Sequence, residues 1–516
     1  MATRTQNAKR NIITSVINKL IIMFANFIMR TVLIKYMGEI YFGLDSLFVS
    51  ILQILNLSEL GISAALVYSM YKPIAEGDDK AVCSLLKLYR TVYRVIALII
   101  TVAGLALIPF LPKLIKSGSE IPPEVNLYLL YLIHLGTTVL SYVFFAYRSV
   151  LFTANQKYSI NNNIYSAFKI GATIIQALTI ILFRNYYVYC FVLPLEMALK
   201  NLAGYLLSKK MYPQYKCEGN IPKEEMSGIK KRVAGVFLYK VSGVFRNSFD
   251  NIVLSMFLGL AVVGQYNGYY YIINAISGIM ILVSNSVTAS VGNSIVTETK
   301  QKNYEDFKKI QLLYMWISSW LTVCLFACLQ PFMELWVGWG AMFDDGLMII
   351  FCIYFLTNHF SRMGFLYRQA AGLWWQDRYR PVVESLVNLG LNILLVRYLG
   401  VAGVMLSTIF CICFIDCLWG GRVLFKNYFT EEKQSLYTLK LALYLVLTIL
   451  AGEICYLISS WIGIRGVTGI IINVIIASVI GNAIFALGTS FLPEFKPSVN
   501  FALRLVGIKK SKKKSS

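Results

Sequence analysis

About fourteen apolar stretches, each roughly 20 residues long, follow one another along almost the whole chain. A helix of about 20 apolar residues is long enough to cross the hydrocarbon core of a bilayer. The pattern therefore predicts an all-α protein that crosses a membrane about fourteen times. The expected spans are 15–36, 44–68, 88–111, 126–147, 162–183, 186–207, 234–257, 267–291, 310–332, 345–367, 381–399, 401–421, 437–458 and 464–490.

The composition agrees with a membrane protein. Of the 516 residues, 57% are hydrophobic and 14% are charged, whereas soluble domains carry about 25% charged residues. Lysine and arginine give the chain a formal net charge of +22. Most of these cations lie in the connections between apolar stretches, so they are expected to set membrane topology, and no nucleic-acid partner is expected.

The connections alternate between rich and poor in lysine and arginine. Basic connections stay on the cytoplasmic side of a membrane. An even number of spans then places both termini in the cytoplasm. The basic tail, which includes Lys509 and Lys510, is expected to bind anionic lipid headgroups.

The longest polar stretch contains Pro213, Gly219, Pro222 and Gly228, and indicates a linker between two helical bundles. It divides six expected helices from eight. The predicted organisation is an N-lobe of helices 1–6 over 1–208, a cytoplasmic linker over 209–233, a C-lobe of helices 7–12 over 234–430, helices 13 and 14 over 431–495, and a basic cytoplasmic tail over 496–516.

A short repeat supports this division. Residues 36–43 close the first apolar stretch with Gly38 and Gly43, and residues 257–264 close the seventh with Gly259 and Gly264. The two glycine pairs have the same spacing and lie six helices apart. This offset favours two parallel repeats, a common plan among transporters.

Several cations interrupt the apolar stretches, and charges at bilayer depth usually face a bundle interior or a cavity. Arg30 and Lys169 lack an acidic neighbour one helical turn away, whereas Arg246 could pair with Asp250. Helices 1, 5 and 7 therefore offer a cationic, amide-rich lining suited to a phosphate or pyrophosphate. The alternative interpretation of these polar stripes is hydrogen bonding between packed helices.

Isolated acids form a second group. Glu59 and Glu196 lie within expected spans, where a carboxylate could relay protons or bind a coupling cation. Glu196 could also pair with Lys200 along its own helix. Interhelical partnering is the other interpretation of these acids.

Motifs for other chemistry are missing from the sequence. The ten cysteines and two histidines show no metal-ligand spacing, and the sequence holds neither a Walker-type phosphate loop nor a glycine-rich nucleotide fingerprint. We therefore expect no enzyme activity, no cofactor and no metal site.

The helix pattern, the glycines after helix 1 and the segments 250–255 (Asp-Asn-Ile-Val-Leu-Ser) and 259–266 (Gly-Leu-Ala-Val-Val-Gly-Gln-Tyr) carry a family resemblance. Together they resemble the polysaccharide-export branch of the multidrug/oligosaccharidyl-lipid/polysaccharide flippase (MOP) superfamily. The resemblance implies a MATE-like fold of two six-helix lobes plus two C-terminal helices. It also implies a bacterial cytoplasmic membrane, alternating access, and an undecaprenyl-pyrophosphate-linked oligosaccharide moved from the inner to the outer leaflet. A polysaccharide polymerase and other export machinery are the expected protein partners.

The expected site follows from the polar stripes and this resemblance. The residues expected to hold the pyrophosphate are Arg30, Lys19, Lys169 and Arg246. Those expected to contact sugars are Asn162, Gln176, Asn247, Asn274, Tyr270 and Asn388. The candidates for coupling are Glu196, Asp250 and Glu59.

Three other functions stay open at this point. A lipid II flippase shares the expected architecture, and a drug/cation antiporter would depend on an acid such as Glu196 or Glu59. A membrane-embedded glycan polymerase or ligase is the third. It is disfavoured because the longest expected external loop, 112–125, holds few charged residues.

Overall fold

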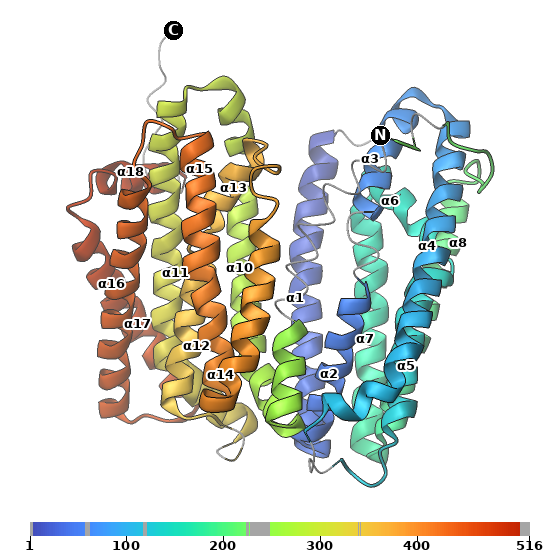
Figure 1. The fold of residues 1–516 in the computed structure, drawn as a ribbon, viewed down its shortest axis with the longest axis horizontal. Helices are drawn as coiled ribbons and strands as arrows, with labels where there is room; N and C mark the ends of the chain where they lie inside the picture. The colour runs from blue at the N-terminus through green and yellow to red at the C-terminus, as the bar shows by residue number, and fades with distance from the viewer. Residues whose placement is uncertain are drawn as a thin grey trace. The chain divides into compact units, whose positions relative to one another are not determined.

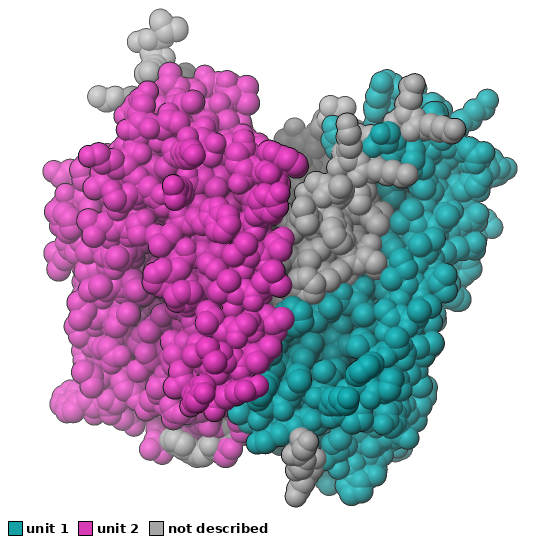
Figure 2. Space-filling view, in the orientation of Figure 1, with its two compact units in different colours: residues 1–264 teal, residues 265–516 magenta. Residues whose placement is uncertain are grey.

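The computed structural model describes residues 4–56, 62–116, 121–222, 226–227, 248–338, 340 and 342–505. Within these residues the regular structure is entirely helical (Figure 1). The chain forms two compact units, unit 1 over residues 1–264 and unit 2 over residues 265–516 (Figure 2). The lobe boundaries expected at 208 and 234 stay predictions.

Among its described residues, unit 1 has four helices of 26 to 34 residues and shorter segments between them. Its helices are α1 (Arg4–Met37), α2 (Glu39–Leu55), α3 (Ile62–Glu76), α4 (Asp79–Leu107), η2 (Ile108–Leu114), α5 (Leu127–Val143), η3 (Ala146–Ser149), α6 (Val150–Ala154), α7 (Tyr158–Phe183) and α8 (Tyr186–Met211). Residues 248–257 are also helical. Helix α1 packs along α7, α7 along α8, and α8 along α5.

Unit 2 begins within a long helix. Its helices are α10 (Leu260–Thr297), α11 (Lys300–Val337), α12 (Asp345–Asn358), α13 (Arg362–Ala370), α14 (Arg380–Phe410), the π-helix η5 (Cys411–Trp419), α15 (Gly420–Asn427), α16 (Gln434–Ile462), α17 (Gly466–Thr489) and α18 (Phe495–Leu505). Helices α11, α16 and α17 pack against one another.

The all-α, multi-pass membrane fold is confirmed. Ten helices among the described residues are long and apolar enough to cross a membrane, and eleven if the bent pair Leu127–Val143 and Ala146–Ala154 is one span. One of them, Arg380–Asn427, is 48 residues long, which at about 1.5 Å per residue is more than twice the bilayer core. Gly400 interrupts it with φ 56° and ψ −132°. This stretch therefore corresponds to two of the expected spans.

Two further expected spans lie only partly within the described residues. The span expected at 44–68 is shared between α2 and α3, because residues 57–61 lie outside the described part of the chain. The span expected at 234–257 is described only from residue 248. These differences account for the lower number of continuous helices.

Side-chain caps fix where several helices begin. The Asn126 side chain accepts hydrogen bonds from the backbone N–H groups of Tyr128 and Leu129 at the start of α5, both at 3.1 Å. Asn185 accepts equivalent bonds from Tyr187 and Val188 at the start of α8. Because the first N–H groups of a helix lack partners within it, these asparagines stabilise the helix ends.

The repeated glycine pairs meet in unit 1. Gly38 (φ 98°) and Gly259 (φ 101°) both have a positive φ just before α2 and α10. A Cβ atom on Gly43 would overlap the carbonyl oxygen of Leu260, and one on Gly264 would overlap the carbonyl oxygen of Glu39. The starts of the two helices therefore cross at backbone contact, which is possible only without side chains at these positions.

Small residues also allow close packing in unit 2. A Cβ atom on Gly452 of α16 would lie 2.7 Å from the Phe326 ring of α11, and one on Gly481 of α17 would lie 3.1 Å from Val323. Helices in membranes associate largely through such close contacts, because lipid offers no hydrophobic driving force between helices.

Helix α18 was not expected. It occupies residues that the sequence assigned to the basic tail, and residues 506–516 lie outside the described part of the chain. Ser498 Oγ donates to the carbonyl oxygen of Lys309 at 3.5 Å, and the Phe495 ring stacks on Trp316. The short apolar face of α18 therefore packs on α11, although it is too short to suggest a span.

Candidate functional site

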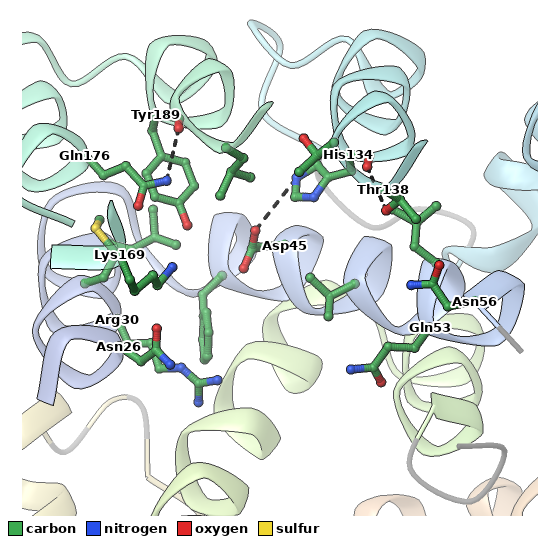
Figure 3. Close-up of a pocket in the computed structure, with 17 residues that line it drawn as sticks. Asn26, Arg30, Asp45, Gln53, Asn56, His134, Thr138, Lys169, Gln176 and Tyr189 are labelled. Carbon is green, nitrogen blue, oxygen red and sulfur yellow. Dashed lines mark hydrogen bonds and ion pairs between the residues drawn. The ribbon is translucent and has the colours of Figure 1, made fainter. Parts of the chain in front are cut away.

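A cavity of about 330 Å³ lies inside unit 1 (Figure 3). Helices α1, α2, α5, α7 and α8 contribute its walls. The polar and charged residues that line it are Asn26, Arg30, Asp45, Gln53, Asn56, His134, Thr137, Thr138, Lys169, Gln176 and Tyr189. The rest of the described lining is apolar and includes Phe42, Leu33 and Leu193.

Two cations share one side of this cavity. Arg30 of α1 and Lys169 of α7 lie near each other in Figure 3, with Asn26 beside them. The Arg30 guanidinium carbon lies 5.1 Å from the centre of the Phe42 ring, within reach of a cation–π interaction. The packing of α1 along α7 explains why two residues 139 positions apart in sequence meet.

Lys169 has an acidic partner on the neighbouring helix. Its Nζ atom lies 3.9 Å from Oε2 of Glu196 on α8. The sequence suggested that Glu196 pairs with Lys200 along α8, and the two charges do interact electrostatically. Lys200 Nζ also lies 5.4 Å from the centre of the Tyr165 ring. The contact between α7 and α8, which one-turn spacing cannot reveal, gives Glu196 a partner across the helix interface.

The cavity also holds an acid and a histidine. Asp45 Oδ1 of α2 lies 3.7 Å from His134 Nε2 of α5. In Figure 3, Asp45 lies between Lys169 and His134, with Thr138 and Asn56 beyond His134. The described lining therefore combines two cations, Arg30 and Lys169, with one acid, Asp45.

Hydrogen bonds orient the amide side chains of the lining. Gln176 Nε2 donates to the carbonyl oxygen of Tyr189 at 3.3 Å. Gln53 Oε1 accepts from Ser248 at 3.3 Å, and Asn56 Oδ1 accepts from Tyr142 at 3.2 Å. Amides held in fixed orientations are suited to recognising ligand hydroxyls.

The structure brings together three of the residues expected from sequence: Arg30, Lys169 and Gln176. Lys19 is exposed on α1 and is not among the described residues that line the cavity. Asn162 lines a second cavity of about 300 Å³, together with Lys200 and Asn201.

Of the expected residues of unit 2, Asn388 and Tyr270 contact other residues of that unit, whereas Asn274 is exposed. Asn388 is fully buried and donates to Thr408 Oγ1 at 3.0 Å, as the alternative of interhelical hydrogen bonding anticipated. The Tyr270 hydroxyl lies 3.4 Å from that of Tyr354, and Asn274 is exposed on α10.

Three expected residues fall outside the described part of the chain: Arg246, Asn247 and Glu59. Asp250 is described and buried within the helical residues 248–257. The expected pairing of Arg246 with Asp250 therefore stays a prediction.

Sequence reasoning missed the contribution of α2. Asp45, Gln53 and Asn56 are spaced eight and three residues apart, which places them along one face of a helix. The same spacing argument that identified the stripe on α7 could have found them. His134 carries no such signal, because it is isolated in an apolar stretch.

Comparisons with known proteins agree with this architecture. A family model described as "Polysaccharide biosynthesis protein" matches residues 8–289, more than half of the 516-residue chain. A search of curated proteins finds no match.

Three solved structures illustrate the likeness in fold. A structure of the lipid II flippase MurJ in an inward closed conformation superposes with a TM-score of 0.67 at 17% identity, covering 93% of this chain and 99% of that one. An inward-facing multidrug resistance MATE family transporter of the MOP superfamily gives 0.60 at 13% identity, covering 80% and 96%. The MATE multidrug transporter DinF-BH gives 0.56 at 14% identity, covering 84% and 98%. The expected MATE-like fold is confirmed.

Proposed function

Since the chain belongs to the polysaccharide biosynthesis protein family, we propose that it flips an undecaprenyl-pyrophosphate-linked oligosaccharide, the repeat unit of a polysaccharide. The direction is from the inner to the outer leaflet of a bacterial cytoplasmic membrane, with both termini in the cytoplasm. The broader activity, that of a MOP-superfamily flippase or transporter, is supported by the family match and by the flippase and transporter folds that the chain resembles.

The observation that carries the proposal is the convergence of Arg30 and Lys169 on one cavity inside a membrane-spanning unit. A guanidinium group can bind two phosphate oxygens at once, and an ammonium group adds a mobile point charge. The pyrophosphate would lie between these two side chains. Asp45 lines the same cavity and would repel the pyrophosphate, which favours a position beside the two cations.

The amide and hydroxyl groups around this position fit the first sugar. Gln176, Asn26, Gln53, Asn56 and Thr138 line the same cavity and would hydrogen-bond sugar hydroxyls. A volume of about 330 Å³ is at the lower end of small-ligand pockets. This volume suits a headgroup and an adjoining sugar, and the remaining sugars and the prenyl chain would extend beyond it.

Alternating access is the transport mechanism that we propose for this site. Rocking of the two predicted lobes about the expected linker at 209–233 would expose the headgroup to one side of the membrane and then to the other. Glu196, Asp250 and Glu59 are the candidates for coupling, and Glu196 is the one whose contact with a cavity cation is described.

A lipid II flippase is the second candidate, favoured by the fold likeness to MurJ. Because lipid II also carries a pyrophosphate, the Arg30 and Lys169 arrangement does not separate the two. A drug/cation antiporter is the third, favoured by the MATE folds, but it fits poorly with two cations in the cavity.

Purified protein in proteoliposomes would test these candidates. Three fluorescent substrates should be compared: an undecaprenyl-pyrophosphate oligosaccharide, lipid II and a cationic dye. We expect transbilayer movement of the first to exceed that of the others by at least about tenfold. Faster movement of lipid II would support the second candidate, and movement of the dye alone would contradict a flippase.

A further inference from the structure

Two neighbouring cavities of opposite character lie beside α18 in unit 2. One is polar, about 450 Å³, and is lined by the end of α10, the start of α11 and α18. The other is apolar, about 490 Å³, and is lined by α10, α11, α17 and α18. Ile310 and Phe501 belong to both linings, so the two cavities adjoin.

The polar cavity is cationic. Its described lining contains Lys302, Lys309 and Arg504 against the single carboxylate of Asp306. Asp306 Oδ1 accepts from Lys302 at 2.9 Å and from Lys309 at 3.1 Å. One acid shared between two lysines leaves an excess of positive charge, to which Arg504 adds.

The apolar cavity is a groove with two tryptophans in its wall. Trp316 and Trp320 of α11 both line it, together with Phe501 of α18. The indole N–H of Trp316 donates to Asn482 at 2.8 Å, and that of Trp320 donates to Ser478 at 2.9 Å. With these polar atoms satisfied, the groove offers a hydrocarbon surface.

We propose that these two cavities form a binding site for one anionic glycerophospholipid. Its phosphate lies among Lys302, Lys309 and Arg504, and one acyl chain lies in the groove along Trp316 and Trp320. A soluble phosphate would use only the polar cavity and a neutral lipid only the groove. Because the cationic cavity and the apolar groove adjoin at Phe501, the combined site fits a molecule with an anionic head and a hydrocarbon tail.

The expected orientation agrees with this occupant. The basic connection at 298–302 is one of those that the positive-inside rule places in the cytoplasm. Anionic phospholipids attract basic segments at that surface. The inference does not depend on the proposed substrate, because no residue of these two cavities lines the cavity of unit 1.

Brominated lipids would test the site, because bromine on an acyl chain quenches a tryptophan that it touches. The full-length protein would be placed in phosphatidylcholine nanodiscs that contain an equal minor fraction of brominated phosphatidylglycerol or brominated phosphatidylcholine. We expect stronger quenching by the phosphatidylglycerol, by up to about one quarter of the emission, since Trp316 and Trp320 are two of eight tryptophans. The difference should vanish in the variant Trp316→Phe/Trp320→Phe.

Two matched charge variants assign the headgroup contacts. Lys309→Gln with Arg504→Gln should abolish the extra quenching. Lys308→Gln with Lys496→Gln removes one cation from each of the same helices, outside the linings of these two cavities, and should retain the extra quenching. Retention of the protein's thermal unfolding temperature in both pairs shows that each variant is folded.

Several outcomes would overturn the inference. Equal quenching by the two lipids, or an equal effect of both charge pairs, would contradict a headgroup-specific site. Loss of the extra quenching on adding glycerol phosphate would indicate a soluble-anion site. Unbrominated competitors form the last comparison. If an equimolar amount of undecaprenyl diphosphate relieved the quenching by brominated phosphatidylglycerol, and unbrominated phosphatidylglycerol did not, the groove would be assigned to the prenyl carrier.

Discussion

Lys169 Nζ lies 3.9 Å from a carboxylate oxygen of Glu196, with only 18% and 11% of the two side chains exposed. Any anion that binds Lys169 in the cavity must compete with this carboxylate. This competition provides a way to release a bound headgroup, because re-formation of the Lys169–Glu196 ion pair would displace its phosphate.

Removing the charge of Glu196 should therefore strengthen anion binding. Two unit charges about 4 Å apart interact by about 4 kcal/mol at an effective dielectric constant of 20. Without the Glu196 charge, part of this interaction energy with Lys169 becomes available to a bound anion. We expect Glu196→Gln to lower the Kd of farnesyl diphosphate about tenfold, as measured by calorimetry in detergent. Glu453→Gln, on α16 of unit 2, is the control and should leave the Kd unchanged. Weaker binding in Glu196→Gln would contradict the competition.

The crossing of α2 and α10 makes a prediction about stability. Gly43→Ala places a methyl group against the backbone of Leu260, which cannot move as a side-chain tip would. We expect a loss of about 1–3 kcal/mol, typical of overpacking, seen as a lower thermal unfolding temperature. Gly136→Ala in α5 meets no atom within 4 Å and should be neutral or slightly stabilising. Equal unfolding temperatures for the two variants would refute the close crossing.

A buried charge cluster stabilises unit 2 where α13, α14 and η5 meet. Arg380 donates two hydrogen bonds to Asp377, at 2.7 and 2.9 Å, and further bonds to Glu384 and Asp416. Arg380→Met would remove the guanidinium that pairs with these three carboxylates. Breaking a buried ion pair by removing one partner costs about 3–5 kcal/mol, so we expect a large fall in the unfolding temperature or failure to fold.

Arg378 provides the control for that variant. It lies two residues away, and its guanidinium carbon stacks 3.8 Å from the centre of the Trp375 ring, which is exposed. An exposed cation–π contact is worth about 0.5–1 kcal/mol. Arg378→Met should therefore lower the unfolding temperature only slightly. A fall as large as that caused by Arg380→Met would show that the buried cluster adds no stability.

The connection before α5 should respond to pH. Tyr41 donates a hydrogen bond to the Glu124 side chain, and this bond holds the pKa of the exposed Glu124 carboxyl below its ordinary value. A lowered pKa means that the folded protein favours the ionised carboxylate. Its contribution to stability is present above the ordinary pKa and is lost as the pH falls through the folded value.

Two phenylalanine variants separate this contribution from packing. Tyr41→Phe should lower the unfolding temperature at pH 7, and part of this difference should disappear at about pH 3, below the ordinary carboxyl pKa. Tyr187 donates to the backbone carbonyl of Glu124 at 3.0 Å. Because that carbonyl does not titrate, the effect of Tyr187→Phe should not depend on the Glu124 ionisation. The same pH dependence in both variants would contradict the assignment.

The sequence predicted what depends on local pattern. Apolar length identified the helices, and the matching glycine pairs anticipated two equivalent turns, which Gly38 and Gly259 adopt. Helical spacing also put Lys169 and Gln176 on one face of α7. The sequence could not predict contacts between helices. The partner of Lys169 lies on α8, and Asp45 meets His134 only because α2 packs against α5. The amphipathic α18 was missed because eleven residues are too few for a span.

The proposed function requires that Arg30 and Lys169 hold an anion, and transport by paired variants tests this most directly. Flipping of an undecaprenyl-pyrophosphate oligosaccharide would be measured in proteoliposomes for Arg30→Gln/Lys169→Gln. Its control, Lys35→Gln/Arg184→Gln, removes exposed cations at the ends of the same two helices, outside the described lining. We predict that the first pair slows flipping at least about 100-fold, equivalent to about 2.7 kcal/mol, while the control pair retains the wild-type rate. Equal rates in the two pairs would contradict the proposed site.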